Sequence, residues 1–131
     1  MTAVRQVELT VGEHSVLLPA MVDTGNLLRD PITGLPVLVV PFRAVRVLLP
    51  EVARWVQHQE LPPRMRLLSV RTAAGSSLLP VFRPDSCRLY LNGHSCDADV
   101  VVAVTGQEYG GIQALVPLAA LPEKVPVSLE E

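Results

Sequence analysis

The sequence predicts a mainly β fold, a small closed or nearly closed barrel-like body with one or two short helices. Three observations lead to this prediction. Valine and leucine are the commonest residues, and β-branched residues favour strands. Twelve prolines are scattered along the chain, which suits short strands and turns better than long helices. Apolar segments alternate with turn residues throughout. At 131 residues, the chain fits a single domain, 1–131, with its own core.

The first predicted hairpin covers residues 5–23, "RQVELTVGEHSVLLPAMVD". Its first half alternates apolar and polar residues, "GEHS" forms the turn, and residues 16–22 return as a second, more buried strand. "RDPITG" at 29–34 predicts another turn, because Asp-Pro opens turns and glycine closes them. "LPVLVV" at 35–40 is apolar at every position, which predicts a strand buried on both faces.

One helix is predicted in "LLPEVARWVQHQ", residues 48–59. Pro50 suits the first helical turn, and Glu51 suits the positive end of the helix dipole. The helix ends before "LPPR" at 61–64, because proline cannot continue it.

Two further hairpins complete the predicted body. "MRLLSVRT" at 65–72 and "SLLPVFRP" at 77–84 flank the small residues "AAGS". Residues 87–105 give two more strands around Asn92-Gly93, a strong signal for a two-residue turn. An apolar segment, "IQALVPLAAL", precedes an acidic tail at about 122–131 that prolines interrupt.

Composition excludes several classes of protein. Apolar residues make up 49% of the chain and charged residues 18%, so the chain is not a disordered one. The formal net charge of −2 argues against a dedicated nucleic-acid binder. Stretches without a strongly polar residue, such as 35–42, are far shorter than the ~20 residues that span a bilayer. No signal-peptide core is visible, and we expect this chain itself to be soluble.

The two cysteines, Cys87 and Cys96, are expected to be reduced thiols of a cytosolic protein. Although "HSCD" at 94–97 lies near Cys87, the paired short spacings of a zinc site are missing. We therefore expect no metal and no other cofactor.

Arginines gather in the centre of the chain, where Glu51 and Glu60 are the only acids. Two interpretations stay open: a solvated face, or attraction to an acidic partner or an anionic membrane surface. The six residues are Arg43, Arg46, Arg54, Arg64, Arg66 and Arg71.

The candidate catalytic residue is Asp23, a carboxylate at the end of an apolar strand. Burying such a group is costly unless it is paired or hydrogen-bonded. Gly25 allows a sharp turn that brings backbone N–H groups to the carboxylate, and Thr24 supplies a hydroxyl. A carboxylate held rigidly in this way suits a general acid or base. Asn26 can bond substrate or cap the turn, and we favour the turn.

This arrangement resembles the retroviral-type aspartic peptidases. Their single lobe carries one Asp-Thr-Gly at a strand end, a flap hairpin downstream and a late apolar strand-helix element. Asp23-Thr24-Gly25 matches the first, and "VRTAAGSSLLPVF" at 70–82 matches the flap. "IQALVPLAAL" matches the third less well, since Pro117 stands where that group usually has glycine. The resemblance implies a retropepsin-like fold with a substrate-covering flap at Thr72, Ala73, Ala74, Gly75 and Ser76.

A closer resemblance is to the sporulation sigma-E factor processing peptidases. It rests on "DTGNLLRDPITGLPV" at 23–37, on "LLP" before the helix and on "FRPD" after the flap. It implies an aspartic endopeptidase that removes the N-terminal pro-segment of a sporulation sigma factor in the mother-cell cytoplasm. It also implies an N-terminal multi-span membrane domain, absent from this sequence, through which an activator acts. We therefore expect this chain to be the protease domain of a longer, membrane-tethered protein. The matching residues are Asn26, Asp30, Pro31, Thr33, Gly34, Pro36 and Val37.

Aspartic peptidases need two carboxylates, and this chain offers one. No other aspartate is followed by the glycine that shapes the catalytic loop, and the chain is too short for two lobes. We therefore expect a homodimer in which two copies of Asp23 meet at the two-fold axis. Two alternatives remain: a non-catalytic peptide-binding or dimerisation module of the same fold, and a peptidase of that fold with another protein substrate.

Overall fold

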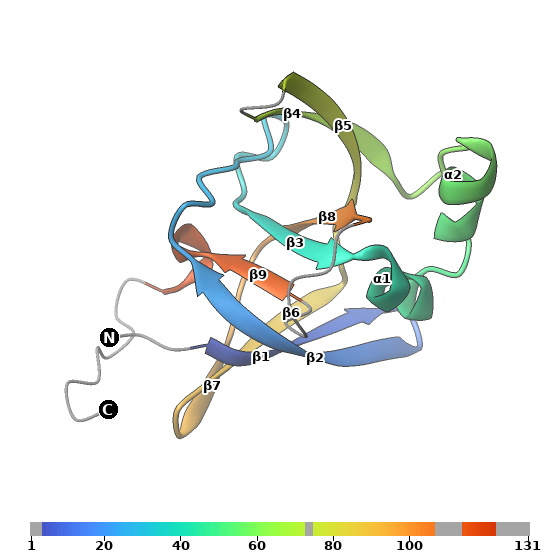
Figure 1. The fold of residues 1–131 in the computed structure, drawn as a ribbon. Coiled ribbons are helices and arrows are strands. Elements are labelled where there is room, and N and C mark those ends of the chain that lie inside the picture. Colours follow the sequence, from blue (N-terminus) through green and yellow to red (C-terminus); the bar gives the residue numbers. More distant parts are fainter. Residues whose placement is uncertain (1–3, 73–74, 107–113, 123–131) are drawn as a thin grey trace.

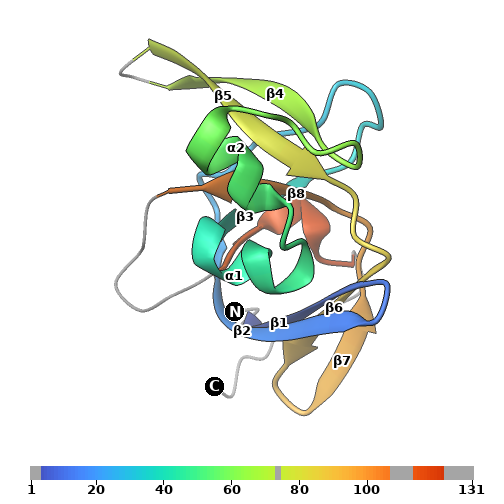
Figure 2. The same cartoon turned by 90° about the vertical axis from the view of Figure 1, so that its right-hand side faces the viewer.

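The protein forms one nine-stranded sheet with two short helices on one side (Figures 1 and 2). The computed structural model describes residues 4–72, 75–106 and 114–122. The strands lie in the order β4-β5-β8-β3-β9-β2-β1-β6-β7. In chain order the elements are β1 (Val4–Val11), β2 (His14–Asp23), β3 (Val37–Pro41), α1 (Phe42–Leu48), α2 (Val52–His58), β4 (Arg66–Thr72), β5 (Gly75–Phe82), β6 (Ser86–Leu91), β7 (His94–Asp97), β8 (Val101–Thr105), β9 (Ala114–Pro117) and the 3-10 helix η1 (Leu118–Ala120).

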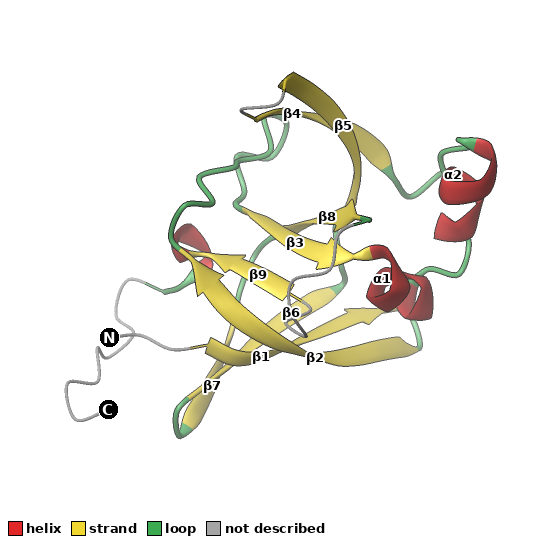
Figure 3. Cartoon of the chain, viewed as in Figure 1, coloured by secondary structure: helices red, strands yellow, loops and turns green. Residues whose placement is uncertain are grey.

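The mainly β prediction is confirmed, including its two short helices (Figure 3), but the described sheet is not closed. β4 and β7 are its two end strands, and no pairing between described residues joins them. The sheet stays open because of the position of the β4–β5 hairpin. Only Val81 and Phe82 of β5 pair with β8, so the rest of the hairpin diverges from the sheet and stands above it in Figure 1.

The predicted hairpins are present. β1 and β2 pair in antiparallel register from Gln6↔Pro19 to Val11↔His14. The turn at Asn92-Gly93 joins β6 to β7, with Gly93 at φ 77. β8 follows β7 as a third strand of this segment, where the sequence predicted two.

Two sequence predictions were wrong in detail. β2 is not the more buried strand of its hairpin, because Leu17 and Met21 are 51% and 45% exposed on its outer face. The helix predicted at 48–59 is present as α2, but it begins only at Val52, so Pro50 lies before the helix and not in its first turn. α1 begins right after β3, at Phe42, where the sequence predicted no helix. Tertiary packing explains this helix, because Ala44, Val45 and Leu48 lie on one face of α1 and are buried.

The apolar core has two parts. The larger part packs β1, β2, β3, β6, β8 and β9 against α1 and includes Leu9, Leu38 and Leu89, all fully buried. The smaller part lies between β3, β4, β5 and β8, and Leu28 and Leu35 of the loop after β2 pack against it. This smaller core therefore joins the loop that follows Asp23 to the β4–β5 hairpin.

Candidate active site

Asp23 is the last residue of β2, half-buried at the point where the strand leaves the sheet. β9 runs parallel to β2 here, with Pro117 opposite Asp23 and Val116 opposite Val22. The late apolar segment thus lies directly beside the aspartate strand, although it carries Pro117. η1 follows it at once, which gives the strand-helix order expected from the resemblance.

The backbone after Asp23 turns back toward its carboxylate. The Gly25 N–H donates to Asp23 Oδ1 at 3.1 Å, and the Asn26 N–H donates to the Asp23 carbonyl oxygen at 3.0 Å. A Cβ at Gly25 would lie 3.4 Å from Asp23 Oδ1, so glycine leaves this flank of the carboxylate open. The predicted approach of a backbone N–H to Asp23 is present.

Asn26 fastens this loop to the sheet. Its Nδ2 donates to the Val37 carbonyl oxygen at 2.9 Å, and its Oδ1 accepts from the Leu28 N–H at 3.0 Å. These bonds agree with the turn-capping interpretation of Asn26. Thr24, by contrast, is exposed and makes no hydrogen bond to any other residue that the structure describes.

A groove with a volume of about 420 Å³ opens beside Asp23. One wall comes from the loop after β2, the other from β4, and the floor from β3 and β9. Arg71 is the one cationic side chain among the described residues that line it. The lining residues are Asp23, Gly25, Asn26, Leu27, Leu28, Val39, Val70, Arg71 and Leu115.

The predicted flap is the β4–β5 hairpin, whose strands pair through to Thr72↔Gly75. Ala73 and Ala74 lie outside the described residues. Gly75 has φ 122, a conformation that favours glycine, and both Gly75 and Ser76 are exposed. Gly75, Ser76 and Thr24 are not among the described residues that line the groove. The groove thus contains Asp23, Gly25 and Asn26 of the predicted site, but neither Gly75 nor Ser76 of the predicted flap.

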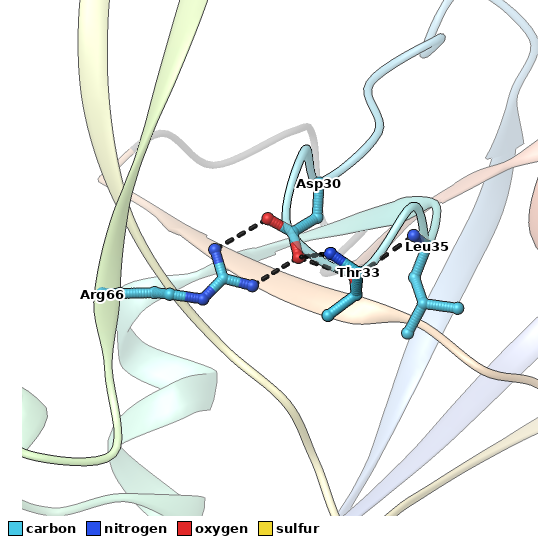
Figure 4. A network of polar contacts seen from close by, with 4 residues as sticks. All are labelled: Asp30, Thr33, Leu35 and Arg66. Carbon is cyan, nitrogen blue, oxygen red and sulfur yellow. Dashed lines mark hydrogen bonds and ion pairs between the residues drawn. The ribbon is translucent and has the colours of Figure 1, made fainter.

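A buried ion pair that the sequence did not predict joins the loop after β2 to β4 (Figure 4). Asp30 is fully buried, and both of its oxygens accept from the Arg66 guanidinium, Oδ1 from Nη1 at 2.7 Å and Oδ2 from Nη2. The Thr33 N–H and hydroxyl donate to Oδ2 at 3.1 and 2.6 Å. The hydrogen bonds from Arg66 hold the pKa of Asp30 well below its usual range, although burial raises it. "DPITG" signalled the turn, but no local pattern signals a partner on β4.

Five of the six central arginines are exposed to solvent, and Arg66 is the exception. Arg66 is buried in part by its pairing with Asp30, and Arg64 forms a 2.5 Å ion pair with Asp85. Arg46, Arg54 and Arg71 are exposed. Arg43 and Arg64 are exposed as well, so Arg66 alone of the six departs from the solvated-face interpretation.

Comparison with known proteins supplies the family. The family model Peptidase_U4, described as sporulation factor SpoIIGA, matches residues 2–112. The chain belongs to the SpoIIGA family. A curated relative, the sporulation sigma-E factor-processing peptidase of Priestia megaterium, is 27% identical over 109 residues, which cover 73% of this chain. The family resemblance drawn from the sequence is thereby confirmed.

The match to the relative covers only 36% of the relative's length. The SpoIIGA family model, in contrast, includes Asp23, the loop after it, both helices and the β4–β5 hairpin. None of the helices within the described ranges is both long enough and apolar enough to cross a bilayer.

Proposed function

We propose that this chain is an aspartic endopeptidase domain that acts as a homodimer with a retropepsin-like arrangement. The observation that carries the proposal is the placement of Asp23. Its carboxylate lines an open groove, a backbone N–H donates to it, and a glycine leaves one flank free. A carboxylate in this setting can exchange a proton with a water or a bound peptide.

Catalysis needs a second carboxylate, which a second copy of the chain supplies. Two copies of Asp23 close together cannot both ionise, so they share one proton. The ionised member takes a proton from a water as the water attacks the peptide carbonyl. The protonated member donates to the carbonyl oxygen, which gives a tetrahedral diol. In the second step one diol hydroxyl gives its proton to the ionised member, the protonated member donates to the amide nitrogen, and the C–N bond breaks to release an amine and a carboxylic acid.

The surface around Asp23 supports association with a second copy. Three large apolar side chains near it in the sequence or the sheet are exposed: Met21 at 45%, Leu27 at 86% and Leu118, next to Pro117, at 54%. Exposed apolar groups gathered in this way favour an interface. Thr24 is also free to reach a second copy and brace its loop, since it has no partner in the described part of its own chain.

The substrate is the precursor of a sporulation sigma factor, from which the enzyme removes an N-terminal segment. The name of the Priestia megaterium relative and the family support a sigma factor as the substrate, and removal of its N-terminal segment is what the resemblance of this sequence implies. The groove runs between a loop and β4, which suits an extended segment bound beside a strand. The β4–β5 hairpin covers the bound segment and excludes water. The domain belongs to a membrane-tethered protein, faces the mother-cell cytoplasm and responds to an activator through its membrane part.

Replacing Asp23 with asparagine tests the proposal. The purified chain, at concentrations from nanomolar to high micromolar, is incubated with the sigma factor precursor from the same genome. Loss of the acid–base pair is expected to slow cleavage by at least about 10²–10⁴-fold. Asp99→Asn is the matched control, because Asp99 is 82% exposed in its ion pair with Arg83 and lies outside the groove. Retained cleavage in Asp23→Asn would overturn the assignment of Asp23.

Dimerisation has its own measurement. Sedimentation across the same concentrations is expected to show a weak dimer, and cleavage rate is expected to rise with the dimer fraction. A fully active monomer would contradict a shared catalytic centre. Binding of the precursor without any cleavage by the parent dimer would instead point to a peptide-binding module.

A further inference from the structure

The strongest unassigned feature of the chain is the buried pair of Asp30 and Arg66. Asp30 is the one buried charged residue in the described ranges, with 0% exposure, and Arg66 retains 34% exposure of its side chain. The two residues are 36 positions apart in the sequence. The pair therefore connects two segments that the local sequence does not bring together.

These two segments are the walls of the groove. Leu27 and Leu28, on the loop wall, shortly precede Asp30, and Val70 and Arg71, on the β4 wall, follow Arg66 on the same strand. A strand advances about 3.3 Å per residue, so Arg66 lies roughly 13 Å along β4 from Val70. In Figure 4 the guanidinium extends from β4 toward the loop and meets both oxygens of Asp30.

The loop that carries Asp30 is itself braced. The Gly34 N–H donates to the Asp30 carbonyl oxygen at 2.7 Å, and the Asp30 N–H donates to the Leu35 carbonyl oxygen at 2.9 Å. Arg29 Nη1 donates to the Gly34 carbonyl oxygen at 2.9 Å. A shift of Asp30 would therefore move this loop as a unit, together with the groove wall that leads into it.

A bidentate contact between an arginine and a carboxylate fixes both the distance between the two side chains and their relative orientation. A buried ion pair adds little net stability compared with apolar residues of similar size, because both charges lose their hydration. The smaller apolar core, in which Leu28 faces Leu68 and Val70 in one cluster, already holds the loop against β4. The particular contribution of the ion pair is geometric.

We propose that Asp30 and Arg66 are positioning residues that set the separation and angle of the two groove walls, and so the fit of the peptide substrate. Neither residue lines the groove, so both act through the residues that do. The inference rests on the proposed peptidase function and adds to it the residues that shape its binding site.

Two mild substitutions test the role. Asp30→Asn keeps an oxygen for the Thr33 N–H and hydroxyl but loses the charge that pairs with Arg66. Arg66→Lys keeps a charge beside Asp30 but loses the planar fork. Each is made in the active chain and in the Asp23→Asn background. The probe is a fluorescent peptide that covers the N-terminal 40 or so residues of the sigma factor precursor.

In the Asp23→Asn background, both substitutions are expected to raise the Kd for the peptide about 5- to 10-fold. In the active chain they are expected to raise KM to the same extent and to change kcat less than twofold. Asp85→Asn and Arg64→Lys disturb a more exposed Arg–Asp pair and are expected to leave Kd and KM unchanged. Leu89→Ala, in the larger core, is the control for stability loss without a change at the groove.

If Asp30→Asn and Arg66→Lys lower the Tm but leave Kd and KM within twofold of the parent values, the positioning role is overturned. It is also overturned if Leu89→Ala, at the same Tm as these variants, raises KM by the same factor. Failure of the proposed function has a different signature. In that case the parent chain cleaves nothing and the Asp23→Asn chain binds no peptide, which overturns both proposals.

Discussion

Replacement of Asn26 with alanine is expected to loosen the loop that presents Asp23. The substitution removes the bond from Nδ2 to the Val37 carbonyl oxygen, 2.9 Å, and the bond from the Leu28 N–H to Oδ1, 3.0 Å. Both bonds are partly buried, so water can replace them only in part. The loop then keeps the Gly25 N–H bond to Asp23 and the Val37 N–H bond to the Leu28 carbonyl oxygen at 3.2 Å, but it loses its side-chain attachment to the start of β3.

The expected cost follows from those two bonds. A hydrogen bond contributes about 0.5–1.5 kcal/mol net, which gives a loss of about 2 kcal/mol in the free energy of unfolding. Unfolding entropy of about 2.1 cal/mol/K per residue converts this to a Tm lower by roughly 7 °C for a chain of this length. Since misplacement of a catalytic group by about 1 Å costs about 10²-fold in rate, kcat/KM is expected to fall by about 10- to 100-fold.

Thermal unfolding by circular dichroism and cleavage of the precursor measure the two effects in the same preparations. Ile32→Ala is the matched control, because Ile32 is 74% exposed in the same loop and lies outside the groove, so its loss should change stability by less than about 0.5 kcal/mol. A Tm for Asn26→Ala within about 1 °C of the parent would refute the inference that Asn26 holds the loop. Equal Tm losses for both variants would refute it as well.

Three further predictions concern the Asp30–Arg66 pair, the turn at Gly34 and the thiols of Cys87 and Cys96. The folded-state pKa of Asp30 lies below its ordinary value of 3.8, so the ionised carboxylate stabilises the fold above about pH 4, and this stabilisation is lost as the pH falls below that value. Asp30→Asn should therefore lower the Tm at pH 7 and make the Tm decline less between pH 4 and pH 2. A decline of the Tm in this pH range equal to that of the parent would contradict the pairing. Gly34 has φ 76 with open space around it, so Gly34→Ala should cost about 1–2 kcal/mol from backbone strain alone in urea unfolding, and a neutral result would mean that the turn adapts. Burial raises the pKa of the free Cys87 thiol to about 12, whereas the half-buried Cys96 thiol has its pKa raised less. Mass spectrometry after alkylation at pH 8 should therefore find label on Cys96 first and on Cys87 only in denaturant. The reverse order would argue against the buried position of Cys87.

Local patterns explain most of what the sequence predicted correctly. Alternation in β1, the all-apolar run of β3 and the Asn92-Gly93 turn are properties of neighbouring residues, and each produced the expected element. The return of the backbone to Asp23 is equally local, because it depends on the two residues that follow. The burial of β2 was misjudged because one face of this strand stays open to solvent, which its own residues do not reveal.

The sequence by itself determined most of the strands, the turns, the family and the aspartate at the end of β2, since these depend on residue type and short spacing. The tertiary structure alone decided that the described sheet stays open, that β4 forms one wall of a groove beside Asp23 and that Arg66 reaches Asp30. The physical reason is distance along the chain. Asp30 and Arg66 are 36 positions apart, with β3 and the two helices between them in the chain, and no short stretch of sequence carries that information.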